Sequence, residues 1–216
     1  MPDPGSERPL SSESGFAEML SVLARTKRVT AQLYLECAAG APHSASRIAL
    51  QQIAEDERLH ASQFAALLPD KSAHDASVPI TPPGCSVNDQ DWASMLMAVF
   101  ALDQAVTGAL VALAQTTDPA VAQTARRVAS EEQAHAEFAV QSFQALADAD
   151  AAVGRRLAHE MVEARDWVRS IFPRRQMLLT LSTAGLLPAG APQAHDTFLA
   201  SLGDRIQEAL GVLGEF

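Results

Sequence analysis

Two short stretches of the sequence each place a histidine three residues after a glutamate. IAEDERLHA, at residues 53–61, contains Glu57 and His60, and VASEEQAHA, at 128–136, contains Glu132 and His135. Positions i and i+3 share one face of a helix, so each pair can project into a common interior. Carboxylates and imidazoles are ligand types that hold iron or manganese. The two boxes therefore suggest two halves of one two-metal centre.

The spacing of the boxes bears on whether they are only polar faces of two helices. A single box of this kind is more often a solvated helix face than a pair of ligands. Here Glu132 follows Glu57 by 75 residues, and His135 follows His60 by the same number. Equal spacing indicates a duplicated unit, which favours a shared site.

The periodicity predicts helices almost throughout and no strand hairpin. A Pro-rich segment of about twenty residues, 68–90, separates the second expected helix from the third and is too long for a hairpin loop. Two helical hairpins joined by such a crossover are typical of a ferritin-like four-helix bundle. We therefore expect an all-α, ferritin-like domain over 15–216, with extra C-terminal helices and a disordered tail over 1–14. The expected helices are 15–39, 44–68, 91–116, 119–147, 150–171 and 193–213, with a short apolar segment, MLLTLSTAGLL, before the last one.

Residues opposite the boxes follow from distance to the turns, because antiparallel helices align residues that are equidistant from the turn. The second hairpin turns near residue 117, so Glu132 should face a residue near 103, where Asp103 interrupts an apolar stretch. A buried acid there needs a partner or a metal. The first hairpin turns near residue 41, so Glu57 should face 25–27. That stretch offers Lys27 and no carboxylate.

Composition limits the classes of protein. The chain has 216 residues, 48% of them apolar, and a formal charge of -10. This acidity argues against a nucleic-acid groove or an anionic membrane surface, which select for clustered Lys and Arg. Two cysteines are too few for a disulfide framework, and neither a signal peptide nor an apolar run of membrane-spanning length is recognisable. We expect a cytoplasmic protein with a small-molecule or protein partner.

Three stretches carry a family resemblance. GAPHSASRIALQQIAEDERLHA, LDQAVTGALVALAQTTDPAVAQTARRVASEEQAHAEF and LAHEMVEARDWVRSIF resemble the catalytic and structural subunits of the phenylacetyl-coenzyme A ring epoxidase, ferritin-like proteins of the phenylacetate catabolism family. The resemblance covers most of residues 27–172. It implies, for a catalytic subunit, two irons that activate dioxygen, held by Glu, Glu-x-x-His, Asp and Glu-x-x-His. It implies, for a structural subunit, a degenerate site without metal that supports the catalytic partner.

The ligand pattern of the catalytic subunit carries over with one departure. Without gaps, its first glutamate falls on Lys27, and its other ligands fall on Glu57, His60, Asp103, Glu132 and His135. The Lys27 ammonium could replace the cation outright, which would make a salt-bridged pseudo-site. It could instead point aside, or serve as a proton donor beside a working metal. The presence of both histidines favours metal, because a lysine-filled site has no use for two imidazole ligands.

The function that we expect is a non-haem di-metal oxygenase or oxidase, such as a di-iron monooxygenase, acting on a small organic or CoA-linked substrate. The cofactor would be two irons, or one, with manganese as an alternative ion. Its partners would be a reductase or a homologous subunit in a homo- or hetero-oligomer. The alternative is a metal-free structural subunit of such an oxygenase, with Lys27 replacing the metal. A rubrerythrin-like or storage ferritin is least favoured, because the chain lacks a Cys-x-x-Cys module and has additional helices.

Overall fold

The protein is helical throughout the part described by a computed structural model, which covers residues 12–68, 92–171 and 175–194 and a few positions up to 204. These residues contain no strand. The helices are α1 (Ser12–Gly40), α2 (Ser44–Ala66), α3 (Trp92–Leu113), α4 (Pro119–Ala149), α5 (Ala151–Ile171) and α6 (Arg175–Thr183). The fold class is therefore the all-α class that the sequence predicts.

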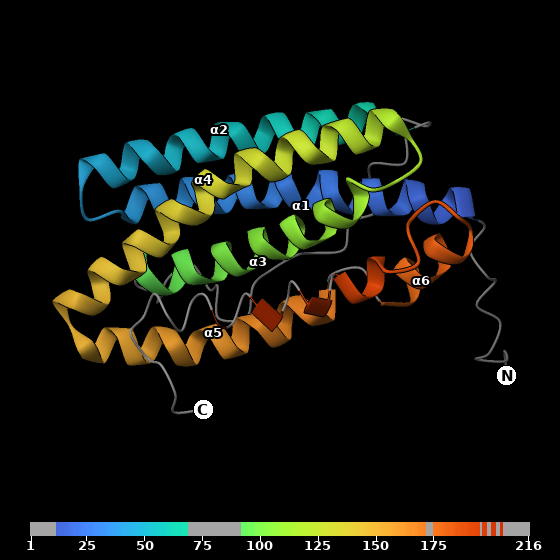
Figure 1. The fold of residues 1–216 in the computed structure, drawn as a ribbon. Coiled ribbons are helices and arrows are strands. Elements are labelled where there is room, and N and C mark those ends of the chain that lie inside the picture. The colour runs from blue at the N-terminus through green and yellow to red at the C-terminus, as the bar shows by residue number, and fades with distance from the viewer. Residues whose placement is uncertain are drawn as a thin grey trace, which may run out of the picture.

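Four of these helices form a bundle, and the other two pack on its outside (Figure 1). The hairpin α1–α2 lies against the hairpin α3–α4, with α1 packed on α3 and α2 on α4. Helix α5 runs along α3 and α4 on the side away from α2, and α6 contacts α1. The interior between the two hairpins is the place where side chains from all four bundle helices can meet.

Helix α3 is the central element of this arrangement. It is in contact with α1, α4 and α5, and most of its residues are buried, from Ala93 to Leu113. By length and composition it could cross a membrane, but 89% of its most apolar window is buried inside the protein. Packing on three sides accounts for its apolar sequence, and it places Asp103 in the interior with no exposed surface.

The start of α4 sets the register of the second hairpin. The Asp118 side chain accepts hydrogen bonds from the backbone N–H groups of Ala120 and Val121, and Pro119 occupies the first turn. These are the expected signals for a helix N-terminus. Because the turn is held at this point, Glu132 comes level with Asp103 on α3.

The observed helices differ from the expected ones mainly at their ends. Helix α1 begins at Ser12 rather than at residue 15, and α3 ends at Leu113 rather than at 116. The apolar segment after α5 contains a helix, α6, which the sequence did not predict. Residues 1–11 of the expected tail, 69–90 of the expected crossover and 205–213 of the last expected helix lie outside the described residues. The domain boundaries stay a prediction.

Candidate functional site

A buried polar cluster lies inside the four-helix bundle, and Lys27 is at its centre. Lys27 Nζ donates hydrogen bonds to Glu57 Oε1 at 2.9 Å, Asp103 Oδ1 at 2.8 Å and Glu132 Oε1 at 2.5 Å. The lysine and the three acids are 0% exposed. A buried ammonium requires partners of opposite charge, and here each of the other three bundle helices supplies one. We call the following six residues the buried polar cluster: Lys27, Glu57, His60, Asp103, Glu132 and His135.

Every bundle helix contributes to the buried polar cluster. Lys27 comes from α1, Asp103 from α3, and one Glu-x-x-His box from each of α2 and α4. The structure thus brings together all six residues that the sequence singles out, at the levels that the turns predict. Four of them can each offer one ligand atom so that all four atoms lie within 4.8 Å of one another: Glu57, Asp103, Glu132 and His135.

The two histidines have a common orientation. The Nδ1 atom of His60 lies 3.0 Å from Glu132 Oε1, and that of His135 lies 3.2 Å from Glu132 Oε2 and 3.4 Å from Glu57 Oε1. Both rings therefore present Nδ1 to the carboxylates of the cluster. The outer nitrogens, Nε2, point away from its centre.

Two outer carboxylates, which sequence reasoning missed, contact these outer nitrogens. His60 Nε2 lies 2.7 Å from Glu131 Oε2, and His135 Nε2 lies 3.5 Å from Asp56 Oδ2. Asp56 directly precedes Glu57 on α2 but contacts His135 on α4. Glu131 directly precedes Glu132 on α4 but contacts His60 on α2. Both pairs therefore connect α2 with α4. The available signal was the acidic residue before each box glutamate. Carboxylates at this position fix the tautomer and the ring orientation of histidines that bind metals.

Tyr34 is a second residue that sequence reasoning missed. Its hydroxyl donates a hydrogen bond to Asp103 Oδ2 at 3.1 Å, and its ring packs edge-on to His135, with 6.5 Å between the ring centroids. Burial, and then the charge of Asp103, raise the pKa of Tyr34. The signal was its position seven residues after Lys27, two turns along the same face of α1.

Comparisons with known proteins agree with this geometry. The family model described as "Phenylacetic acid catabolic protein" matches residues 3–209. The chain belongs to this family. Among solved structures, it is similar to "Protein 19 with aldehyde deformylating oxidase activity from Synechococcus", with a TM-score of 0.71 and 17% identity over 94% of both chains. That likeness confirms the ferritin-like fold. A comparison with curated proteins gives no match.

In this family member, the charged forms of Lys27 and the box glutamates stabilise each other. Burial alone would lower the pKa of Lys27, but the charges of Asp103, Glu132 and Glu57 outweigh it and raise the pKa well above its usual value. Burial alone would raise the pKa of both glutamates. The nearby ammonium and the two histidines lower the pKa of Glu57 and of Glu132 to about 2.

The histidines and Asp103 are also strongly perturbed. Burial alone would lower the pKa of each imidazole, but close contacts with Glu132 and Glu57 raise the pKa of His60 to about 9 and that of His135 to about 10. Burial, and then the charge of Glu132, raise the pKa of Asp103. Without a metal, both imidazoles are therefore protonated at neutral pH.

Two buried polar atoms of the cluster have no hydrogen-bond partner among the residues that the structure describes. These are Glu57 Oε2 and His60 Nδ1. His60 Nδ1 is within ion-pair distance of Glu132, but the geometry is not that of a hydrogen bond. Buried polar atoms without partners are rare and costly, so Glu57 Oε2 is available for a further ligand or ion, whereas His60 Nδ1 faces the Glu132 carboxylate.

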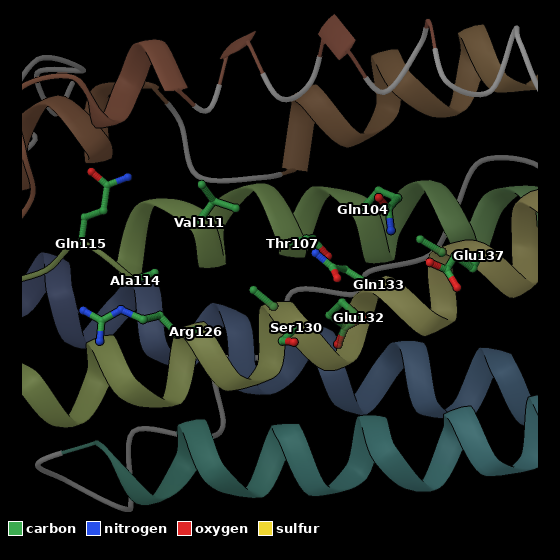
Figure 2. Close-up of a pocket in the computed structure, with 12 residues that line it drawn as sticks. Gln104, Thr107, Val111, Ala114, Gln115, Arg126, Ser130, Glu132, Gln133 and Glu137 are labelled. Atoms are coloured by element: carbon green, nitrogen blue, oxygen red, sulfur yellow. The ribbon is translucent and has the colours of Figure 1, made fainter.

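A cavity of about 640 Å³ between α3 and α4 reaches the edge of this site (Figure 2). Glu132 is part of its lining, and most of the other lining residues are small or polar. The cavity is thus next to the buried polar cluster, although the Glu132 side chain itself has no exposed surface.

Proposed function

We propose that this chain is a ferritin-like oxidase or oxygenase that works with one metal ion, while the Lys27 ammonium takes the place of a second ion. The observation that carries this proposal is the position of Lys27 Nζ, which lies within 2.9 Å of three carboxylates that would otherwise hold metals. The proposal differs from the expected pair of irons, but it keeps the reaction type that the family suggests.

Two ions do not fit these residues. The sixth donor of the family pattern is absent at Lys27, and Nζ already occupies one oxygen of each carboxylate in the cluster. One ion fits better. Four donors whose ligand atoms lie within 4.8 Å of one another match the size of a single coordination sphere with ligand distances of about 2.0–2.4 Å.

The residues that would hold the ion are Glu57, Asp103, Glu132 and His135. Three carboxylates and one imidazole suit iron, and manganese accepts the same donors. A bound ion would supply a Lewis-acid and one-electron centre at which dioxygen is reduced. The electrons would come from a partner reductase.

The chain's own residues would orient the donors and balance their charge. Because the pKa of Lys27 is raised well above its usual value, its Nζ keeps its protons and acts as a fixed cation, which disfavours a proton-donor role. Tyr34 holds one oxygen of Asp103 by its hydroxyl. Asp56 and Glu131 orient the two imidazoles.

The proposed substrate class follows from the family and from the cavity next to the site. The family suggests a small organic or CoA-linked molecule, and the structural neighbour is named for activity on an aldehyde. The cavity beside Glu132 offers a route by which such a molecule could approach the site. A cytoplasmic location and an oligomer with a homologous subunit belong to the same proposal.

A second candidate function is that of a metal-free structural subunit, and one observation favours it. Without metal, the cluster contains one ammonium and two imidazoles that are protonated at neutral pH, against three carboxyl groups. These charges balance when Asp103 is ionised. The histidines would then have a use without metal, as counter-ions of the carboxylates.

Metal stoichiometry distinguishes the two candidates. Protein loaded with ferrous iron under anaerobic conditions and freed of excess ion should carry one iron per chain. Lys27→Glu restores the family's sixth donor and should raise the content to two. Arg28→Glu, an exposed neighbour on α1, is the matched control and should stay at one. A wild-type protein without iron would favour the structural subunit, and two irons in the wild type would show that Lys27 does not replace an ion.

A further inference from the structure

The cavity between α3 and α4 has properties that packing alone does not explain. On α3 the cavity is lined by Gln104, Thr107 and Val111, which share one helix face, and Ala114 follows directly after the end of that helix. On α4 the lining recurs on one face as well, from Arg126 through Ala129 to Glu137. Figure 2 shows the α3 side chains along one side of the cavity and the α4 side chains along the other. The two helices thus face each other here through small and polar residues rather than a sealed apolar interface.

Gln104 supplies a hydrogen-bond donor that lacks a partner. Its side chain is 2% exposed and lines the cavity, and in the described part of the chain its Nε2 has no hydrogen-bond partner. Leaving a buried amide N–H without a hydrogen-bond partner destabilises the folded state. A ligand oxygen in the cavity would accept this hydrogen bond.

Charge differs between the two ends of the cavity. In Figure 2, Arg126 lies toward one end, beside Ala114 and Gln115, and Glu137 lies toward the other. Arg126 is exposed and has no ion-pair partner among the described residues. An anionic group would therefore be attracted to the Arg126 end and repelled from the Glu137 end.

The separation of these groups sets the length of a ligand. Gln104 is next to Asp103, at the level of Glu132, and Arg126 is six residues before Glu132 on α4. At 1.5 Å per residue this is about 9 Å along the helix. Val111, Ala114, Ala129 and Ala136 provide apolar surface along the cavity.

We propose that the α3–α4 cavity binds an elongated amphipathic carboxylic acid, with its carboxylate on Arg126 and an oxygen acceptor on Gln104 Nε2. The alkyl chain between the two groups lies against the alanine-lined walls. This proposal does not depend on metal in the buried polar cluster, and it holds whether the chain is an oxidase or a structural subunit.

The test is calorimetric titration of the full-length, chelator-treated protein with three eight-carbon probes: 8-hydroxyoctanoate, octanoate and 1,8-octanediol. The hydroxy acid should bind about tenfold more tightly than either probe that lacks one end group, since each charge-assisted or buried hydrogen bond contributes about 1.4 kcal/mol. Absence of binding by the hydroxy acid at millimolar concentration, or equal binding of the diol, would overturn the proposal.

Matched variants assign the end groups. Arg126→Gln should weaken both carboxylates about tenfold and leave the diol unchanged. Arg127→Gln, the exposed neighbour that does not line the cavity, should change nothing. Gln104→Leu should remove the advantage of the hydroxy acid over octanoate. If Arg126→Gln and Arg127→Gln lower the affinity for the carboxylates equally, the binding is non-specific charge attraction and the proposal is wrong.

Filling the cavity provides an independent check. Ala129→Phe should abolish binding of all three probes, while circular dichroism verifies the helical fold. Should that variant fail to fold, Ser130→Phe fills the same cavity from an exposed position on α4. Unchanged binding in a folded variant of either kind would place the ligand elsewhere and contradict the inference.

Discussion

The two hairpins of the bundle contribute the same pattern of residues with one charge reversed. Hairpin α1–α2 supplies Lys27, Glu57 and His60, whereas hairpin α3–α4 supplies an acid at the position of the lysine, followed by Glu132 and His135. Asp103 follows Lys27 by 76 residues, close to the 75 that separate the boxes. Lys27 and Asp103 are thus near-equivalent positions that bind each other across the bundle.

The lysine in place of one acid shows how a protein with buried carboxylates can fold without metal ions. In a symmetric site, both hairpins would contribute an acid here, and the buried negative charge would need metal or protons. With one acid exchanged for a lysine, part of the positive charge is supplied by the chain itself. The first hairpin therefore supplies a fixed cation, while the second supplies three of the four proposed metal donors, Asp103, Glu132 and His135.

Removing the Lys27 ammonium should lower the stability of the bundle more than any other change to the two hairpins. Lys27→Met leaves three carboxylates buried around an apolar side chain, and removing one partner of a buried ion pair costs about 3–5 kcal/mol. For about 200 residues each kcal/mol shifts the melting temperature by roughly 2–4 °C. We expect the metal-free variant to melt about 6–20 °C lower by circular dichroism.

Arg28→Met is the matched control for this loss, because Arg28 is exposed on the same turn of α1. It should change the melting temperature by no more than about 2 °C, as surface substitutions usually do. Equal melting of wild type and Lys27→Met would mean that the carboxylates do not depend on the ammonium.

Exchanging the two charges tests whether Lys27 and Asp103 are equivalent. In Lys27→Asp the cluster gains an acid and loses its cation, and in Asp103→Lys it gains a second cation. The double variant restores one of each, so it should be more stable than either single variant. We expect a coupling energy of about 2 kcal/mol from a denaturant double-mutant cycle. Additive losses would show that the hairpins differ in more than this charge.

The stability of the metal-free protein should depend on pH through the histidine and the box glutamate of each hairpin. The pKa of each histidine is raised, from 6.5 to about 9 for His60 and about 10 for His135, so their contribution to stability is complete below pH 6.5 and is lost as pH rises toward 10. The pKa values of Glu57 and Glu132 are lowered from 4.5 to about 2, so their contribution is complete above pH 4.5 and is lost as pH falls toward 2.

Stability measured by denaturant titration with chelator present should therefore be highest between about pH 4.5 and 6.5. His135→Gln should remove part of the alkaline decline, because one raised pKa is then absent. A stability that stays constant from pH 6.5 to 10 would mean that the imidazoles are not counter-ions in the metal-free state.

Much of this arrangement could be predicted from the sequence, because it depends on the register of helices. Equal spacing of the two boxes and distance from the turn were sufficient to place Asp103 opposite Glu132 and Lys27 opposite Glu57. The all-α fold followed from the helical periodicity of the sequence. The ligand roles of the six residues stay a prediction.

The features that were missed depend on side-chain direction and on gaps in packing. Asp56 and Glu131 are half-exposed acids on polar helix faces, and nothing in the sequence shows that they cross to the histidine of the other hairpin. Tyr34 reads as an apolar core residue, since its hydroxyl contact with Asp103 requires the two helices in place. The α3–α4 cavity arises from alanines that look like ordinary helix-forming residues.

The smallest expected effect concerns the outer acids, whose two contacts are unequal. Glu131 lies 2.7 Å from His60 Nε2, whereas Asp56 lies 3.5 Å from His135 Nε2, at the limit of a hydrogen bond. A carboxylate at close range favours the imidazolium, so Glu131→Gln should lower the pKa of His60 by about one, and Asp56→Asn should lower that of His135 by less. Both values can be followed by NMR titration of metal-free protein, with Glu137→Gln on the same helix as a control. If Asp56→Asn has the larger effect, the strengths of the two outer contacts are not ordered as the distances indicate, and the stronger contact is the one at His135.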